Sequence, residues 1–387
     1  MVSLLLPIIY LSFISLGLPD ALLGAAWPVM CLEFNVPVSF AGIISITISC
    51  GTIISSLMSD RLTRRFGTAK VTACSVAMTA CALFGFSITG SFWLLLLWAI
   101  PYGLGAGSVD ASINNYVALH YASRHMSWLH CMWGVGASIG PYIMGYALNG
   151  GQGWNMGYRY IALMQMVLTA ILVLSIPHWK RRDTDVTEGN GAAAAALSLK
   201  EVFAIRGAKE IMVAFFCYCA LEGTAMLWSA TYLVRYVGMQ EERAASLASM
   251  FFLGITTGRA LSGFMTYKFN DTNMIRIGQV VILAGVIVML LPLGELAALA
   301  GLLLVGLGCA PIYPSVIHST PNHFGEENSQ AIIGVQMASA YLGSLLAPPV
   351  FGLIANHISA SVLPFYLALI LVVMVFMCEQ LNRKCKV

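Results

Sequence analysis

Apolar runs of about 20 residues recur along the whole 387-residue chain, and short polar breaks separate them. A helix of about 20 apolar residues crosses a hydrocarbon core of about 30 Å, because it rises about 1.5 Å per residue and satisfies its own backbone hydrogen bonds. Only 10% of the residues are charged, against about 25% in soluble domains. The pattern predicts an all-α membrane protein with twelve transmembrane helices, over residues 3–31, 38–58, 69–89, 91–118, 127–149, 157–177, 209–236, 243–265, 272–292, 295–318, 328–355 and 360–379.

The break at residues 178–208 differs from the others in length and polarity. It contains KRRDTD and TEGNGAAAAA, and it ends in a short amphipathic segment that begins at Ser198. Glu201 follows Ser198 by three residues, which is the spacing of a capping box at a helix N-terminus. We predict an N-terminal six-helix half over 1–177, a cytoplasmic linker with a short amphipathic helix over 178–208, and a C-terminal six-helix half over 209–387.

Lysine and arginine gather on one side of this topology. They occur in the break after the second span, in the linker and at the C-terminus, whereas only Arg159, Arg235 and Arg243 fall on the other side. Membrane loops rich in Lys and Arg stay in the cytoplasm. Both termini and the linker are therefore predicted to be cytoplasmic. No cleavable signal is evident, because the first apolar run lacks a basic segment before it and is long enough to span.

The two predicted halves resemble each other in sequence. The fourth span contains GLGAGSVDASI and the tenth contains GLGCAPIYPSV, a register that sets Asp110 opposite Tyr313. The first and seventh spans each carry an acid that a tryptophan follows six or seven residues later. Halves built as a repeat are typical of secondary transporters, whose binding site lies where the halves meet.

Three acids lie well inside predicted spans: Asp20 in the first, Asp110 in the fourth and Glu222 in the seventh. A carboxylate at the centre of a membrane helix costs about 2.5–3.5 kcal/mol on insertion scales. Each acid has two interpretations: a structural group that a neighbouring helix satisfies, or a working proton or substrate site. Because all three fall on helices expected to line a central cavity, we predict that they carry proton coupling.

Polar and aromatic side chains accompany these acids at helical spacing. Asn114 follows Asp110 by four residues, and Tyr218 precedes Glu222 by four, so each pair shares a helix face. Amides and carboxylates bind sugar hydroxyls, and aromatic faces pack on the C–H side of the ring. For each aromatic residue, packing or anchoring at the membrane interface is the alternative. The residues predicted to line a substrate cavity are Asp20, Trp27, Asn114, His130, Trp133, Tyr218, Glu222, Trp228, Tyr313 and Gln336.

The break after the second span, SLMSDRLTRRFGTAK, combines acidic and basic residues at a membrane edge. Asp60 and Arg61 begin it, and Arg259 in GRALSGFMTYK occupies the counterpart position after the eighth span. Positive-inside topology accounts for the basic residues but not for Asp60. We predict that these three residues form cytoplasmic gate pairs that break when the halves rock.

Twelve helices, a six-plus-six repeat, a central linker and the loop pattern SxxxDR…RRFG together resemble the major facilitator superfamily over essentially the whole chain. Ser56 stands where that loop pattern usually has glycine. Four stretches also resemble the fucose–galactose–glucose:proton symporter family, to which the fucose permease belongs: LGLPDALLGAAWP, GLGAGSVDASINN, SWLHCMWGVGASIGP and GLGCAPIYPS.

This resemblance implies that acids of the first and fourth helices, here Asp20 and Asp110, take part in proton-coupled sugar uptake. The fourth-helix acid is a glutamate in the fucose permease. Amides of the permease's fifth helix align with His130 and Trp133 of this sequence. Related members carry other hexoses, and some are coupled to sodium.

We therefore expect a secondary active transporter that imports a small polar solute, a hexose, together with protons by alternating access. Two alternatives stay open. One is a proton-coupled antiporter that exports amphipathic compounds, because GASIGPYIMG in the fifth span partly resembles the motif of drug:proton antiporters. The other is a sodium-coupled or uncoupled sugar transporter.

Other classes fit the sequence less well. No nucleophile, base and orienting group are arranged for an enzyme, and a sensor or scaffold would need a soluble domain for which the linker and termini are too short. The ten cysteines lack His partners at metal-ligand spacing and are interpreted as small hydrophobic residues. We expect no metal, no cofactor and no nucleic-acid partner. The predicted protein is a monomer in the bacterial inner (plasma) membrane, with lipid, sugar and protons as its partners.

Overall fold

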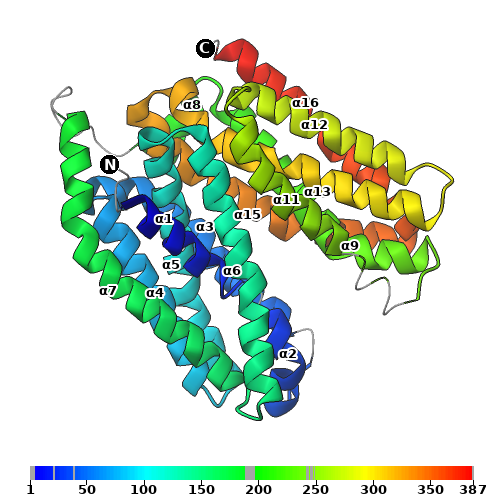
Figure 1. Ribbon diagram of the computed structural model, residues 1–387, viewed down its shortest axis with the longest axis horizontal. Coiled ribbons are helices and arrows are strands. Elements are labelled where there is room, and N and C mark those ends of the chain that lie inside the picture. Colours follow the sequence, from blue (N-terminus) through cyan, green and yellow to red (C-terminus); the bar gives the residue numbers. More distant parts are fainter. Residues whose placement is uncertain are drawn as a thin grey trace. The chain divides into compact units, whose positions relative to one another are not determined.

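The computed structural model describes residues 5–20, 22–37, 40–187, 197–240, 244, 247 and 249–385. All regular structure within these ranges is helical, and none of it is strand (Figure 1). Ten helical segments of the described ranges are long and apolar enough to cross a membrane, and the first of them, Leu5–Glu33, combines α1 and α2. The two remaining expected spans correspond to α6 (Ser123–Asn149) and α11 (Ser249–Met265); the start of the span predicted at 243–265 falls largely outside the described residues. The predicted all-α membrane architecture is confirmed.

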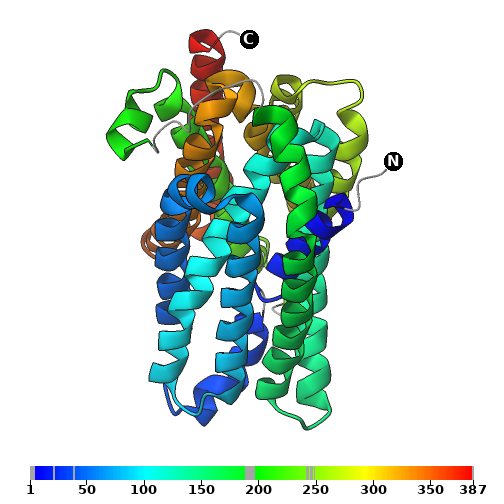
Figure 2. The ribbon, with the colours of Figure 1, turned by 90° about the vertical axis from the view of Figure 1, so that its left-hand side faces the viewer.

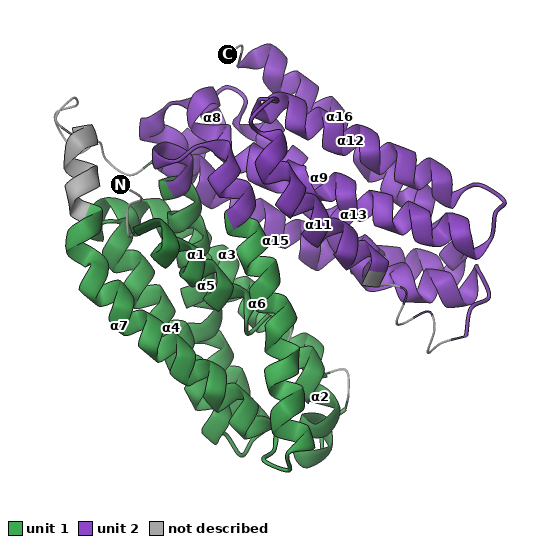
Figure 3. Cartoon of the chain, in the orientation of Figure 1, with its two compact units in different colours: residues 1–116, 129–197 green, residues 117–128, 198–387 purple. Residues whose placement is uncertain are grey.

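The chain divides into two compact units (Figure 3). Unit 1 comprises residues 1–116 and 129–197, and unit 2 comprises residues 117–128 and 198–387. The end of α5 and the start of α6 therefore pack with unit 2, although the rest of both helices belongs to unit 1. The helices that form or enter unit 1 are α1 (Leu5–Gly17), α2 (Leu22–Glu33), α3 (Ala41–Phe66), α4 (Thr68–Ile88), α5 (Phe92–His120), α6 and α7 (Trp154–Thr187).

Within unit 1, α4 and α7 pack along each other (Figure 2). Helix α7 continues past its predicted end at residue 177 to Thr187. Residues 188–196 of the predicted linker lie outside the described residues.

Unit 2 begins its second segment with a short capped helix. Its helices are α8 (Leu199–Ala204), α9 (Ala208–Arg235), α11, α12 (Asp271–Met289), α13 (Glu295–His318), α14 (Thr320–Phe324), α15 (Glu326–His357), the 3-10 helix η2 (Ala360–Val362) and α16 (Leu363–Lys384). The predicted capping box is confirmed at α8: the Glu201 N–H donates to Ser198 Oγ at 3.4 Å, and the Ser198 N–H donates to Glu201 Oε2 at 2.6 Å. The Ser198 hydrogen bonds lower the pKa of the Glu201 carboxyl.

The first expected span, 3–31, is not one continuous helix. Helix α1 ends at Gly17, residues 18–20 form a turn, and α2 begins at Leu22. In an α-helix the N–H of residue 19 would bond to the carbonyl of Ser15, but proline has no N–H. The break therefore follows from Pro19, and it places Asp20 in the turn and not on a helix face.

Helices α1 and α6 approach each other closely at this break because α6 presents glycines. A Cβ added to Gly136 would lie 2.0 Å from the Ile14 carbonyl oxygen, and one added to Gly140 would lie 2.0 Å from the Leu18 carbonyl oxygen. These glycines allow close helix packing, because a residue without a side chain lets the two backbones approach. The crossing brings the polar residues of α6 beside the turn that holds Asp20.

Candidate functional site

Asp20 accepts hydrogen bonds from two neighbouring helices of unit 1. The Trp133 indole Nε1–H of α6 donates to Asp20 Oδ2 at 2.7 Å, and the Tyr102 hydroxyl of α5 donates to Oδ1 at 3.5 Å. The first bond is of ordinary length and the second is weak. The Asp20 side chain remains exposed. The structure therefore brings together two predicted site residues, Asp20 and Trp133, and adds Tyr102, which the sequence patterns did not identify.

The carbonyl freed by Pro19 has a dedicated partner. The Gln165 Nε2 amide of α7 donates to the Ser15 carbonyl at 2.8 Å, and the Thr79 hydroxyl of α4 donates to Gln165 Oε1 at 2.9 Å. Gln165 is buried at 2% exposure. A very small hollow lies behind the break, lined by Tyr102, Gln165, Thr79 and their neighbours. Sequence reasoning missed Gln165, although a lone amide in an apolar span signals a buried polar partner.

Asp110, Asn114 and His130 form a buried chain of hydrogen bonds. Asn114 Nδ2 donates to Asp110 Oδ1 at 2.8 Å, and Asn114 Oδ1 lies 3.1 Å from His130 Nε2. An amide oxygen only accepts, so His130 carries its proton on Nε2 in this arrangement. The Phe13 ring of α1 packs edge-on against His130, with centroids 5.3 Å apart. The predicted pairing of Asp110 with Asn114 along one helix face is confirmed.

Helix α6 connects the two acids of unit 1. His130 and Trp133 lie three residues apart on α6; His130 belongs to the Asp110 chain and Trp133 bonds to Asp20. Unit 1 thus contains a site with two acids, one exposed and one buried, that are joined through a single helix.

Glu222, the acid of unit 2, lies in a different environment. Arg259 Nη2 of α11 donates to Glu222 Oε1 at 3.1 Å, and the Arg259 side chain is 4% exposed. Tyr218 precedes Glu222 by four residues on α9. Its ring packs with Phe215 and with Tyr313, at centroid distances of 6.1 and 5.8 Å. Arg259 therefore pairs with Glu222 inside unit 2, and its predicted place in a cytoplasmic gate remains a prediction.

The other predicted lining residues of unit 2 have identified neighbours. Trp228 Nε1 donates to the Pro348 carbonyl at 2.9 Å. The Tyr313 hydroxyl donates to Met337 Sδ at 3.2 Å, and the Thr320 hydroxyl donates to Gln336 Oε1 at 3.1 Å.

In unit 1, Trp27 is buried in an apolar cluster and packs edge-on against Phe92 at 6.4 Å. Asp60 pairs with Arg64 at 2.8 Å, and Arg61 is exposed. Substrate contact by Trp27, and by Trp228, Tyr313 and Gln336 of unit 2, stays a prediction, as does the gate role of Asp60 and Arg61.

A polar network that the sequence did not predict lies in unit 2. The Ser123 hydroxyl donates to Asp271 Oδ1 at 2.5 Å, and His318 Nδ1 lies 2.6 Å from Asp271 Oδ2. His318 Nε2 lies 3.0 Å from the Tyr121 carbonyl oxygen. These contacts tie the turn between α5 and α6 to α12 and α13. The sequence offered little signal, because Asp271 also suits the first turn of a helix.

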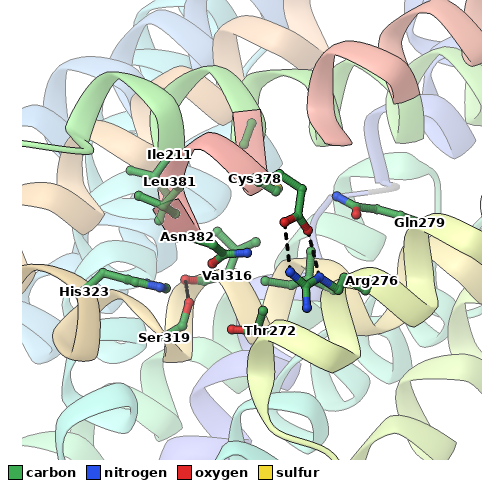
Figure 4. Close-up of a pocket in the computed structure, with 13 residues that line it drawn as sticks. Ile211, Thr272, Arg276, Gln279, Val316, Ser319, His323, Cys378, Leu381 and Asn382 are labelled. Carbon is green, nitrogen blue, oxygen red and sulfur yellow. Dashed lines mark hydrogen bonds and ion pairs between the residues drawn. The ribbon is translucent and has the colours of Figure 1, made fainter. Parts of the chain in front are cut away.

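Figure 4 shows a small pocket of unit 2 that none of the predicted site residues line. Arg276 makes two hydrogen bonds to Glu379, at 2.7 and 2.8 Å, so the two side chains form an ion pair. Burial lowers the pKa of His323, another lining residue. In the described part of the chain, no group of three or more His, Cys, Asp or Glu side chains is suited to hold a metal ion.

A family model described as Major Facilitator Superfamily matches residues 9–295 and 211–381. The glucose/mannose transporter GlcP of Bacillus subtilis is 21% identical over 314 residues, covering 79% of this chain and 77% of that protein. The 4-hydroxybenzoate transporter PcaK of Pseudomonas putida is 23% identical over 381 residues, covering 87% and 83%. The sequence is thus similar to transporters of chemically different solutes.

Two solved structures share the fold. FucP in its outward conformation matches with a TM-score of 0.76 at 14% identity, covering 97% of this chain and 98% of that chain. The proton:xylose symporter XylE matches with a TM-score of 0.78 at 13% identity, covering 97% and 94%. These matches confirm the resemblance to the fucose permease type that the sequence motifs predicted.

Proposed function

The chain belongs to the Major Facilitator Superfamily, and from that premise we propose that it carries a small polar solute, a hexose, together with protons. It is a multi-pass transporter of the cell inner membrane. Its proposed cycle is alternating access, in which the two halves rock about a central site. Asp20 and Asp110 are the proposed coupling residues.

The observation that carries the proposal is the environment of Asp20. Both hydrogen-bond donors found for this carboxylate, Trp133 and Tyr102, are neutral. A carboxylate bonded to neutral donors can take up a proton without leaving an unpaired buried cation behind. Glu222 differs, because protonating it would leave Arg259 as a buried charge without its counterion. Asp20 is therefore the better proton carrier.

The two carboxylate oxygens of Asp20 have different capacities for a proton. Oδ2 faces the Trp133 N–H, which can only donate, so a proton on Oδ2 would clash with that donor. Oδ1 faces the Tyr102 hydroxyl, which can either donate or accept. We propose that Oδ1 holds the proton and that Tyr102 then reverses its hydrogen bond and accepts.

The Asp110 chain supplies hydrogen-bonding groups of the kind that sugars need. Asn114 offers an amide, His130 an imidazole and Asp110 a carboxylate. Trp133 contributes an aromatic face close to Asp20. Sugar hydroxyls would exchange hydrogen bonds with this set, so substrate binding and the protonation of the acids would influence each other.

A second candidate substrate class is an organic acid. Arg259 is a buried guanidinium, and guanidinium groups bind carboxylates in a bidentate manner. PcaK, which is similar to this chain, is named for 4-hydroxybenzoate transport. A carboxylate substrate would replace Glu222 as the partner of Arg259.

Transport by purified protein in liposomes distinguishes these candidates. Labelled glucose, mannose, xylose and 4-hydroxybenzoate are each supplied outside, with an inward proton gradient and a pH dye inside. We expect sugar uptake that requires the gradient and carries protons inward. Uptake of 4-hydroxybenzoate alone would favour the organic-acid reading, and sugar uptake without proton movement would refute proton symport.

A further inference from the structure

An apolar groove runs along the surface of unit 1 between α3 and α4, with α5 as its floor. Its volume is about 410 Å³, and its lining residues are Ser55, Met58, Leu62, Phe66, Lys70, Val71, Cys74, Ser75, Met78, Leu104 and Ser108. The polar groups of the floor are satisfied, since Ser55 bonds to Ser108 and to the Leu104 carbonyl. The rim is apolar and open: Met58, Phe66 and Met78 are 44%, 47% and 36% exposed. We call this feature the α3–α4 groove.

The length of the α3–α4 groove matches one leaflet of a bilayer. Along α3 its lining extends from Ser55 to Phe66, about 16 Å at the rise of an α-helix. Half of a hydrocarbon core is about 15 Å. The groove opens at the turn between α3 and α4 and ends near the middle of both helices. Helix α3 also has the smallest buried share of the ten candidate spans, 28%, as expected for a helix that contacts lipid.

Two cations stand at the open end of the groove. Lys70 lines it and is exposed. The Arg65 guanidinium lies over the Phe66 ring, 5.3 Å from its centroid, and Phe66 also lines the groove. Arg64 is already paired with Asp60, whereas among the described residues neither Lys70 nor Arg65 forms an ion pair. The mouth therefore carries positive charge that an anionic group would complement.

We propose that the α3–α4 groove binds an anionic phospholipid, with one acyl chain in the groove and the phosphate group at Lys70 and Arg65. An acyl chain gains little free energy when it leaves lipid for an apolar groove, because both surroundings are apolar. The charge of the headgroup therefore determines which lipid binds. Basic pockets between membrane helices on the cytoplasmic side suit such headgroups. The positive-inside pattern assigns this end of α3 to the cytoplasm. The proposal stands independently of the transported solute.

Native mass spectrometry of the purified full chain tests the proposal. The protein is equilibrated with an equimolar mixture of phosphatidylglycerol and phosphatidylethanolamine that have identical acyl chains. Wild type should retain phosphatidylglycerol preferentially. The double variant Arg65→Gln/Lys70→Gln should lose about 25-fold of that preference, because each of the two cations contributes a factor of about five. Lys268→Gln, which removes an exposed cation from unit 2, is the matched control and should keep the preference.

A second variant tests the acyl chain separately. Cys74 is exposed and lines the groove, so Cys74→Trp should fill it and reduce retention of both lipids. Elution as a single species in size exclusion verifies that each variant is folded. Equal retention of the two lipids by wild type, an unchanged preference in the double variant, or undiminished binding to Cys74→Trp would each overturn the proposal.

Discussion

Replacing Asp20 with asparagine removes the proposed proton carrier and changes little else. Asparagine has nearly the same shape, and its amide oxygen can still accept from Trp133, whose indole donates to Asp20 at 2.7 Å. Losing the charge on the acceptor weakens that bond by about 1 kcal/mol. The neutral amide is also less costly than a carboxylate to hold beside apolar helices, which offsets that loss. Asp20→Asn should therefore fold about as stably as wild type, and its thermal unfolding should show this.

Transport by Asp20→Asn should lose its coupling and keep its solute pathway. One proton entering down 100 mV releases about 2.3 kcal/mol, which sustains about fortyfold solute accumulation. In liposomes with a potassium diffusion potential of that size, wild type should approach this ratio. The variant should equilibrate near a ratio of one and still exchange labelled for unlabelled solute across the membrane.

The matched control for Asp20→Asn is Glu33→Gln. Glu33 is an exposed acid of the same unit, and its carboxylate also accepts from an indole, that of Trp154, at 2.6 Å. It lies at the end of α2, and it should keep full accumulation. Accumulation by Asp20→Asn equal to that of wild type at the same potential would refute the role given to Asp20.

Three further changes test the structure around Asp20 and Glu222 by thermal unfolding of the purified protein. Gly140→Ala places a Cβ 2.0 Å from the carbonyl oxygen of Leu18, in the turn after α1, and should destabilise the protein by about 1–3 kcal/mol. Gly145→Ala, which has open space around it, should not destabilise it. Equal effects of the two variants would contradict the close helix crossing. Gln165→Leu should lower the free energy of unfolding by about 1–3 kcal/mol, because the Ser15 carbonyl at the proline break loses its donor. An unchanged melting temperature would show that this hydrogen bond does not stabilise the break. Arg259→Gln should lower the free energy of unfolding by about 3–5 kcal/mol, because it leaves Glu222 without its cation. The double variant Arg259→Gln/Glu222→Gln should recover most of that stability. A double variant no more stable than the single one would contradict a mutually dependent pair.

Local features of this chain could be predicted from its sequence. Helices follow from apolar runs of sufficient length, and the pairing of Asp110 with Asn114 follows from a spacing of four residues. The capping box at Ser198 depends on residues three apart. Each of these depends on neighbours within about one helical turn, whose geometry the backbone determines.

Contacts between helices could not be predicted in the same way. Trp133 is 113 residues from Asp20 along the chain, and no periodicity in the sequence indicates that they meet. The partner of Glu222 was missed for a similar reason. Arg259 was interpreted from its place near a predicted loop, and the sequence does not indicate that it reaches Glu222 on α9. The helix break at Pro19 could have been predicted, since proline removes one helical hydrogen bond. The residue that bonds to the freed Ser15 carbonyl could not, because Gln165 lies 150 residues away along the chain.

Asp20 and Glu222, the two acids at corresponding positions of the predicted repeat, differ in their hydrogen-bond partners. Asp20 lies in a turn, is exposed and accepts from neutral donors, whereas Glu222 lies within α9 and pairs with a buried guanidinium. A symmetric carrier with two equivalent proton sites would load two charges, and the membrane potential would then act on both. Glu222 is paired with Arg259, whereas Asp20 has no charged partner among the hydrogen bonds found for it. We therefore propose that Asp20 is the acid that exchanges protons, and that Glu222 and Arg259 bind polar groups of the solute or stabilise unit 2 without changing their charge.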